Sequence, residues 1–204
     1  MIQMKTGVMG GTFDPVHRGH LAIAEEAYRF LNLHQVIFVP AGQPYFKNLL
    51  EISPAEDRVK MLRLAIQKVP YFKLSLVEVQ RKGPSYTVDT LALLKEASRG
   101  RDELYFIMGW DSLQALPKWK DPDKILSLCI IVAAPRPGFP KPDLQELERE
   151  LPGIARKTIF LEKPVLDISS TQIRERVRAG LTIEELVPVE VAKYIRAKGL
   201  YLDK

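Results

Sequence analysis

Two histidines near the start of the chain have the type and spacing to do chemistry. His17 and His20 lie three positions apart, with Arg18 between them, in the segment Gly10-Gly-Thr-Phe-Asp-Pro-Val-His-Arg-Gly-His20. A helix is expected to begin near Arg18 or Gly19, and its first amide groups make an anion site. Two imidazoles on one side of that site predict donors for phosphate oxygens. In phosphoryl and nucleotidyl transfer, positioning and charge stabilisation supply most of the catalysis. No nucleophilic residue is required, because the substrate's own phosphate can attack.

Other interpretations of this segment fit less well. It contains neither the G-x-x-x-x-G-K-[ST] phosphate loop nor the G-x-G-x-x-G dinucleotide fingerprint. A zinc site needs further ligands, and the one remaining histidine, His34, is expected at the surface. Two surface histidines beside a turn would leave the cluster of Gly10, Gly11, Pro15 and Gly19 unexplained.

A second set of polar residues lies near the C-terminus. Ser169, Ser170 and Thr171 precede a helical stretch that carries Arg174 and Arg178 on one face. Hydroxyls, helix amides and a guanidinium together make a polyphosphate cradle. A helix cap explains only one of the hydroxyls. From these residues alone, capping with a solvated helix and phosphate binding are about equally supported.

Single polar residues follow two further strand-like segments. Gly109 and Asp111 follow one of them, where the carboxylate suits ribose hydroxyls or the cap of a helix starting near Ser112. Arg136 follows the next, as a phosphate contact or as one half of a loop-supporting ion pair. Trp119 taken alone is more often a packing residue, although its flat face could also stack on a cationic ring.

The elements that position these residues alternate between strand-like and helical patterns. Strands are expected over 6–9, 36–40, 72–79, 104–108, 128–134 and 158–161, and helices over 18–31, 54–69, 87–99, 170–179 and 188–198. Ser53 is expected to cap the helix that begins at Pro54. This order predicts an α/β fold, Rossmann-like and doubly wound, with a mainly parallel sheet and helices on both faces. The segments 10–20, 109–111 and 135–138 should therefore meet beyond the carboxyl ends of the strands.

Composition sets the class of protein. The 204 residues suit a single domain, 1–204, with a small C-terminal helical part from about 170 to 204. A net charge of +5 suits phosphorylated metabolites as well as nucleic acid, and the basic residues form no dense tract. The sequence shows neither a signal peptide nor a membrane span, and its single cysteine, Cys129, is expected to be buried and inert. We expect a cytoplasmic protein with no nucleic-acid or membrane partner; homo-oligomer formation is left open.

The histidine segment resembles the signature of the H-x-G-H nucleotidyltransferase superfamily, and more narrowly bacterial nicotinate-nucleotide adenylyltransferases. The resemblance covers nearly the whole chain. Its further matching segments are Pro84-Ser-Tyr-Thr87, Gly109-Trp-Asp-Ser112, Leu116-Pro-Lys-Trp119, Arg136-Pro-Gly138 and Ile168-Ser-Ser-Thr-Gln-Ile-Arg174. The resemblance implies transfer of AMP from ATP to nicotinate mononucleotide, giving nicotinate adenine dinucleotide and pyrophosphate. It implies Mg²⁺ carried by the ATP phosphates, with no dedicated protein ligands.

The resemblance also implies roles for individual residues. His17, His20 and Arg174 would be catalytic. The ATP-binding residues would be Gly10, Gly11, Thr12, Phe13, His17, His20, Gly109, Asp111, Ile168, Ser169, Ser170, Thr171 and Arg174. The acceptor-binding residues would be Lys47, Tyr86, Thr87, Trp119 and Arg136. The family usually has a histidine just before this lysine, where Phe46 stands here, and a phenyl ring cannot donate to phosphate.

Three alternatives stay open. The same chemistry could act on nicotinamide mononucleotide, which lacks one carboxylate. It could act on phosphopantetheine, although that family has threonine in place of His17. A non-catalytic nucleotide-binding module would keep the fold but lose the phosphate-binding set, which is intact here.

Overall fold

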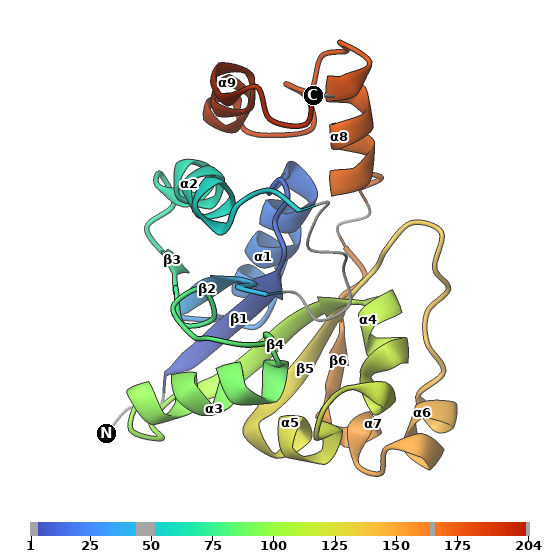
Figure 1. The fold of residues 1–204 in the computed structure, drawn as a ribbon. Helices are drawn as coiled ribbons and strands as arrows, with labels where there is room; N and C mark the ends of the chain where they lie inside the picture. Colours follow the sequence, from blue (N-terminus) through green and yellow to red (C-terminus); the bar gives the residue numbers. More distant parts are fainter. Residues whose placement is uncertain (1–3, 44–51, 164–165, 203–204) are drawn as a thin grey trace.

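A twisted parallel sheet forms the centre of the computed structural model, which describes residues 4–43, 52–163 and 166–202 (Figure 1). Its six strands follow the order β3-β2-β1-β4-β5-β6, and every neighbouring pair is parallel. The strands are β1 (Lys5–Gly11), β2 (Gln35–Pro40), β3 (Phe72–Leu74), β4 (Glu103–Gly109), β5 (Cys129–Ala134) and β6 (Thr158–Phe160). The expected doubly wound, Rossmann-like α/β fold is confirmed, and the sheet is wholly parallel rather than mainly so.

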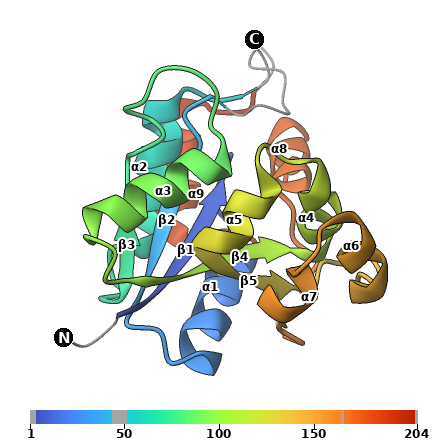
Figure 2. The same ribbon diagram turned by 90° about the horizontal axis from the view of Figure 1, so that it is seen from below.

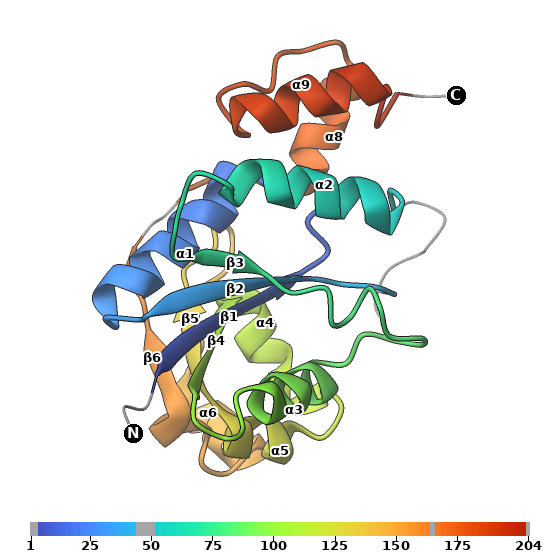
Figure 3. The same cartoon turned by 90° about the vertical axis from the view of Figure 1, so that its left-hand side faces the viewer.

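Helices cover both faces of the sheet (Figure 3). One face carries α1 (Arg18–Phe30) and α2 (Ala55–Ile66), and α3 (Thr87–Ala97) and α5 (Pro122–Leu128) lie on the other. Each face has its own buried apolar core: Ala24 and Met61 belong to the first, Leu91 and Ile125 to the second. Burial on both faces explains the near-continuous apolar runs of the central strands.

The C-terminal helices α8 (Ser170–Arg178) and α9 (Val189–Lys198) lie above the sheet, and α9 lies next to α2 (Figure 1). Ile173 and Ile195 are buried in the same core as Met61 of α2. This shared core supports the expectation of one domain over 1–204, which stays a prediction.

Shorter helices join the strands of the second half. They are α4 (Trp110–Ala115), the 3₁₀ turn η2 (Leu116–Lys118), α6 (Leu144–Glu150) and α7 (Ile154–Lys157). Seen from below, α4, α5, α6 and α7 gather around β5 (Figure 2). Apart from a start near Ser112, none of them was expected from the sequence, because short segments show too few turns to reveal a period.

Two expectations about the first half are wrong. The strand expected over 72–79 ends at Leu74, because the chain turns there and brings Glu78 into the protein interior. Pro54, not Ser53, is the N-cap of α2. The backbone N–H of Ser53 instead donates to Oδ2 of Asp14, 3.1 Å away, so this residue holds a loop.

Two expectations about residues without a predicted function are confirmed. Cys129 is buried, and burial raises the pKa of its thiol to about 12. His34 is exposed, and its Nδ1 accepts a hydrogen bond from the Lys5 amide. Within the described residues, no helix has the length and apolarity needed to cross a bilayer.

Candidate functional site

Two adjoining cavities open at the carboxyl ends of β1 and β4, where the strand order reverses. The first, about 310 Å³ and here named the histidine cavity, is lined by His17, His20, Arg174 and others. The second, about 520 Å³ and here named the α3 cavity, is lined by Tyr86 and Thr87 at the start of α3. Gly10, Thr12, Phe106 and Trp119 line both cavities. Groups bound in the two cavities would therefore meet at a common wall.

The two histidines face each other at the start of α1. Their rings stack with centroids 3.6 Å apart, and the amide of His17 donates to Nδ1 of His20 at 3.2 Å. Because Nδ1 accepts this bond, the neutral ring of His20 carries its proton on Nε2. That tautomer makes His20 a hydrogen-bond donor at the cavity.

Small and strained residues hold this pair in place. A Cβ on Gly19 would lie only 3.0 Å from Nδ1 of His17, so glycine leaves the room that the ring needs. Phe13 has a left-handed φ of 52°, and its buried ring meets that of His20 edge-on at 5.1 Å. A left-handed bulky residue is uncommon and typical of functional loops.

His17 is buried and incompletely satisfied. Desolvation, and next the nearby charge of Arg136, lower its pKa from 6.5 to about 4. Its Nδ1 is a buried atom without a hydrogen-bond partner among the described residues. His17 is also the N-cap of α1, so one buried imidazole both begins this helix and lines the histidine cavity.

The start of α8 forms the opposite wall of the histidine cavity. The hydroxyl of Ser169 accepts from the Gln172 amide at 3.1 Å and so caps the helix. Ser170 donates to the carbonyl of Pro15 at 2.9 Å, and Nη1 of Arg174 donates to the carbonyl of Asp14 at 2.9 Å. These bonds bring the two predicted phosphate-binding segments together, although 155 residues separate Pro15 and Ser170 in the sequence.

Asp111 and Arg136 form an ion pair across the ends of β4 and β5. Gly109, not Asp111, is the N-cap of α4. The second oxygen of Asp111, Oδ1, is buried and lacks a partner among the described residues, and a Cβ on Gly109 would lie 2.5 Å from it. The ion pair holds the carboxylate of Asp111 at the wall of the histidine cavity, and its role toward a ribose hydroxyl stays a prediction.

The α3 cavity combines an uncapped helix start with an aromatic wall. Tyr86 is the N-cap of α3 and makes no side-chain cap bond, so the first amides of the helix lack that partner. Trp119 meets Phe106 edge-on, with centroids 6.3 Å apart. An anionic group attached to a flat ring fits this combination.

The buried side chain of Arg58 links the backbone segments that line the two cavities. Its side chain is 2% exposed, and Nη1 donates to the carbonyls of Thr12 at 2.9 Å and Ala41 at 2.7 Å. Its Nε donates to the carbonyl of Ser53 at 3.0 Å. One buried guanidinium thus connects the loop after β1 with the loop after β2.

Most of the predicted site residues meet at these cavities. The predicted ATP-binding residues line the histidine cavity, except Gly11, which lines the α3 cavity. Tyr86, Thr87 and Trp119 line the α3 cavity, and Arg136 lies in the histidine cavity. Lys47 and Phe46 lie outside the described residues, so their predicted role stays a prediction.

Sequence reasoning missed Arg58, Glu78 and Tyr201. The side chains of Arg58 and Tyr201 bond to the loop after β1 and that of Glu78 to Thr90 in α3, and no local pattern marks these residues. Their distance from the motifs in the sequence hides this role. Among the described residues, no cluster of three or more histidine, cysteine or acidic side chains could hold a metal ion.

Comparisons with known proteins agree with this arrangement. Residues 8–176 match the model of the family described as cytidylyltransferase-like. A protein of Dehalococcoides mccartyi, named probable nicotinate-nucleotide adenylyltransferase, is 52% identical over 204 residues, which is 100% of each chain. A protein of the same name from a Roseiflexus species is 45% identical over 195 residues, 96% of each chain.

A solved structure shares the fold at low identity. Nicotinic acid mononucleotide adenylyltransferase of Plasmodium falciparum, complexed with NaAD, is 20% identical and superposes with a TM-score of 0.79, covering 97% of each chain. With most of the chain matched by the family model and full-length relatives at 45% and 52% identity, the chain belongs to the nicotinate-nucleotide adenylyltransferase family of cytidylyltransferase-like proteins.

Proposed function

We propose that this chain transfers AMP from ATP to nicotinate mononucleotide, giving nicotinate adenine dinucleotide and pyrophosphate. The observation that carries the proposal is that Gly10 and Thr12 line both the histidine cavity and the α3 cavity. The first cavity would hold phosphates and the second an anionic ring. A reaction that joins two phosphates needs both ligands at one boundary. The names of the relatives support the choice of these two substrates.

ATP would occupy the histidine cavity. The Nε2 donor of His20 and the guanidinium of Arg174 would bind phosphate oxygens and stabilise the charge that develops on them. The α8 N-terminus would add backbone donors for the leaving pyrophosphate. Oδ1 of Asp111 would accept from a ribose hydroxyl.

Nicotinate mononucleotide would occupy the α3 cavity. Its carboxylate would bind the first amides of α3 at Thr87, and its cationic ring would stack on Trp119. Its phosphate would then lie at the common wall and attack the α-phosphorus in line, with pyrophosphate leaving on the opposite side. The attacking phosphate is already anionic, so the protein need not supply a nucleophile or a base.

Mg²⁺ would enter with ATP. The ATP phosphates and water would hold the ion, because Mg²⁺ usually keeps several of its waters when it binds. When bound, it neutralises charge on the phosphate oxygens. The cytoplasmic location, the absence of nucleic-acid and membrane partners and the oligomeric state remain predictions.

Pyrophosphate release tests the proposal. Purified protein is given MgATP with nicotinate mononucleotide in one tube and nicotinamide mononucleotide in another. Release with the acid alone is expected, since the amide cannot bring an anion to the α3 amides. Equal rates would remove the carboxylate recognition but keep the chemistry, and release with neither would overturn the proposed reaction.

A further inference from the structure

Glu78 is a buried acid in the α3 cavity to which the proposed reaction gives no role. Its side chain is 7% exposed, although it lies in a turn after β3 where carboxylates normally reach solvent. Burial raises the pKa of this carboxyl above its ordinary value, and its hydrogen bond from Thr90 acts against that rise. A buried acid needs such a partner, and the contacts around Glu78 identify its role.

A hydrogen bond from Thr90 ties Glu78 to α3. Oγ1 of Thr90, one turn into the helix, donates to Oε1 of Glu78 at 2.5 Å and also lies 3.2 Å from the carbonyl of Tyr86. Thr90 is itself 3% exposed. The carboxylate therefore holds the first turn of the helix whose amides line the cavity.

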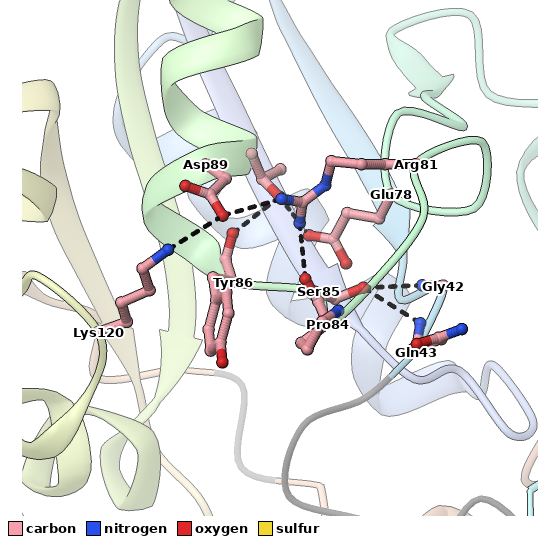
Figure 4. A network of polar contacts seen from close by, with 10 residues as sticks. Gly42, Gln43, Glu78, Arg81, Pro84, Ser85, Tyr86, Asp89 and Lys120 are labelled. Carbon is pink, nitrogen blue, oxygen red and sulfur yellow. Dashed lines mark hydrogen bonds and ion pairs between the residues drawn. The ribbon is translucent and has the colours of Figure 1, made fainter.

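Ser85 ties the segment between Glu78 and α3 to the loop after β2 (Figure 4). The hydroxyl of Ser85 accepts from the amides of Gly42 at 3.0 Å and Gln43 at 3.3 Å. The amide of Ser85 in turn donates to the carbonyl of Gln43 at 3.0 Å.

Contact between the two segments is as close as the backbone allows. A Cβ on Gly42 would lie 2.2 Å from the carbonyl oxygen of Glu78, so only glycine fits there. On the outer side, Arg81 bonds Asp89 at 2.8 Å and the carbonyl of Pro84 at 3.0 Å. The segment before α3 is thus fastened on both sides.

We infer that Glu78 and Ser85 are positioning residues that fix the start of α3 against the loop after β2 and so set the geometry of the acceptor site. The inference rests on the proposed function. Glu78 is not assigned a proton-transfer role, because an anionic phosphate has no proton to give up in the attack. Its Oε1 instead accepts from Thr90 in α3, and its backbone carbonyl packs against Gly42 in the loop after β2.

Separate KM values for the two substrates test the inference, using Ser85→Ala and Glu78→Gln in the full chain. Each variant is expected to raise KM for nicotinate mononucleotide about tenfold, as the loss of one or two hydrogen bonds would. KM for ATP should stay within about twofold. Because both residues support the same contact between the start of α3 and the loop after β2, the double variant should cost less than the sum of the two single variants.

Glu148→Gln is the matched control. Glu148 also accepts two hydrogen bonds, from the amides of Gly153 at 2.7 Å and Ala155 at 2.9 Å, but lies at the connection between α6 and α7. Its variant should leave both KM values unchanged. Thermal melting of all variants, with direct calorimetric binding of nicotinate mononucleotide, separates loss of binding from loss of folding.

The outcomes distinguish the two proposals. An inactive wild-type protein would overturn the proposed function. An active wild type with an unchanged KM for the acceptor in Ser85→Ala would overturn the positioning role. A lower acceptor KM in Glu78→Gln alone would show that the residue acts through repulsion of the acceptor carboxylate, which also overturns it.

Discussion

The hydroxyl of Tyr201 donates a hydrogen bond to Oδ1 of Asp14 at 2.8 Å, joining residues 187 positions apart. Asp14 is 3% exposed and lies in the loop between β1 and α1 that carries the two histidines. Burial, then the charge of Asp14, raise the pKa of Tyr201 far above its ordinary value, so the hydroxyl remains a donor at any working pH. The end of the chain therefore supports the proposed nucleotide site.

Tyr201→Phe should impair both stability and ATP binding. Removing the hydroxyl leaves a buried carboxylate short of one partner, which costs about 1–3 kcal/mol. Because the carbonyl of Asp14 also accepts from Arg174, we expect a higher KM for ATP. Tyr194→Phe is the control: it loses a 2.6 Å bond to Asp57 between α9 and α2, away from the loop. Equal KM values for ATP in both variants would contradict the role of Tyr201.

His20→Ala should lower kcat by about 10²–10³, the usual effect of removing a preorganised donor to developing charge. The melting temperature should fall only modestly, since the half-buried ring borders a cavity and the main bond lost is the one from the His17 amide. The exposed His34 provides the control variant His34→Ala, which should keep the wild-type rate. Pyrophosphate release measures both, and an active His20→Ala protein would contradict the assigned role.

The free energy of unfolding should fall as the pH drops from about 6.5 to about 4. In that window His17 is protonated in the unfolded chain but neutral in the folded protein, where its pKa is about 4. The unfolded state then binds more protons, so acid favours it, by on the order of 3 kcal/mol across the window. Denaturant unfolding at several pH values should show a shallower slope for His17→Asn. Parallel curves for the two proteins would contradict the lowered pKa.

Nicotinate mononucleotide should quench the fluorescence of Trp119. The chain has two tryptophans, and the other, Trp110, packs edge-on against Phe160 with centroids 6.4 Å apart. Titration of Trp110→Phe should keep the quenching, and that of Trp119→Phe should lose it. The reverse assignment would place the pyridine ring elsewhere.

Periodicity and turn chemistry predicted the sheet and the long helices. The α1 helix begins at Arg18 as expected, because the glycines before it and the apolar spacing within it are local signals. The strand expected over 72–79 stops early. Phe72 is buried because it belongs to the paired strand, whereas Glu78 is buried because a turn brings it into the interior, and the even spacing of the two does not reflect further pairing. Local pattern does not separate these two causes of burial.

In the functional site too, features with a local sequence signal were predicted and features that depend on long-range contacts were not. The histidine segment and the segment from Ile168 to Arg174 were found from the sequence because each concentrates its chemistry in a few residues. The pairing of Asp111 with Arg136 and the bond between Tyr201 and Asp14 were left open or missed. Such contacts depend on which loops the parallel sheet brings to one edge.

The buried guanidinium of Arg58 also affects how the sequence can change. It binds Thr12, Ala41 and Ser53 only through their backbone carbonyls, which every amino acid provides. These bonds to Arg58 therefore place no demand on those three side chains. Substitutions of Thr12, which lines both cavities, can adjust the fit to a ligand while the bond to Arg58 is kept, whereas Arg58 itself has no equivalent replacement, because lysine lacks the planar fork of donors.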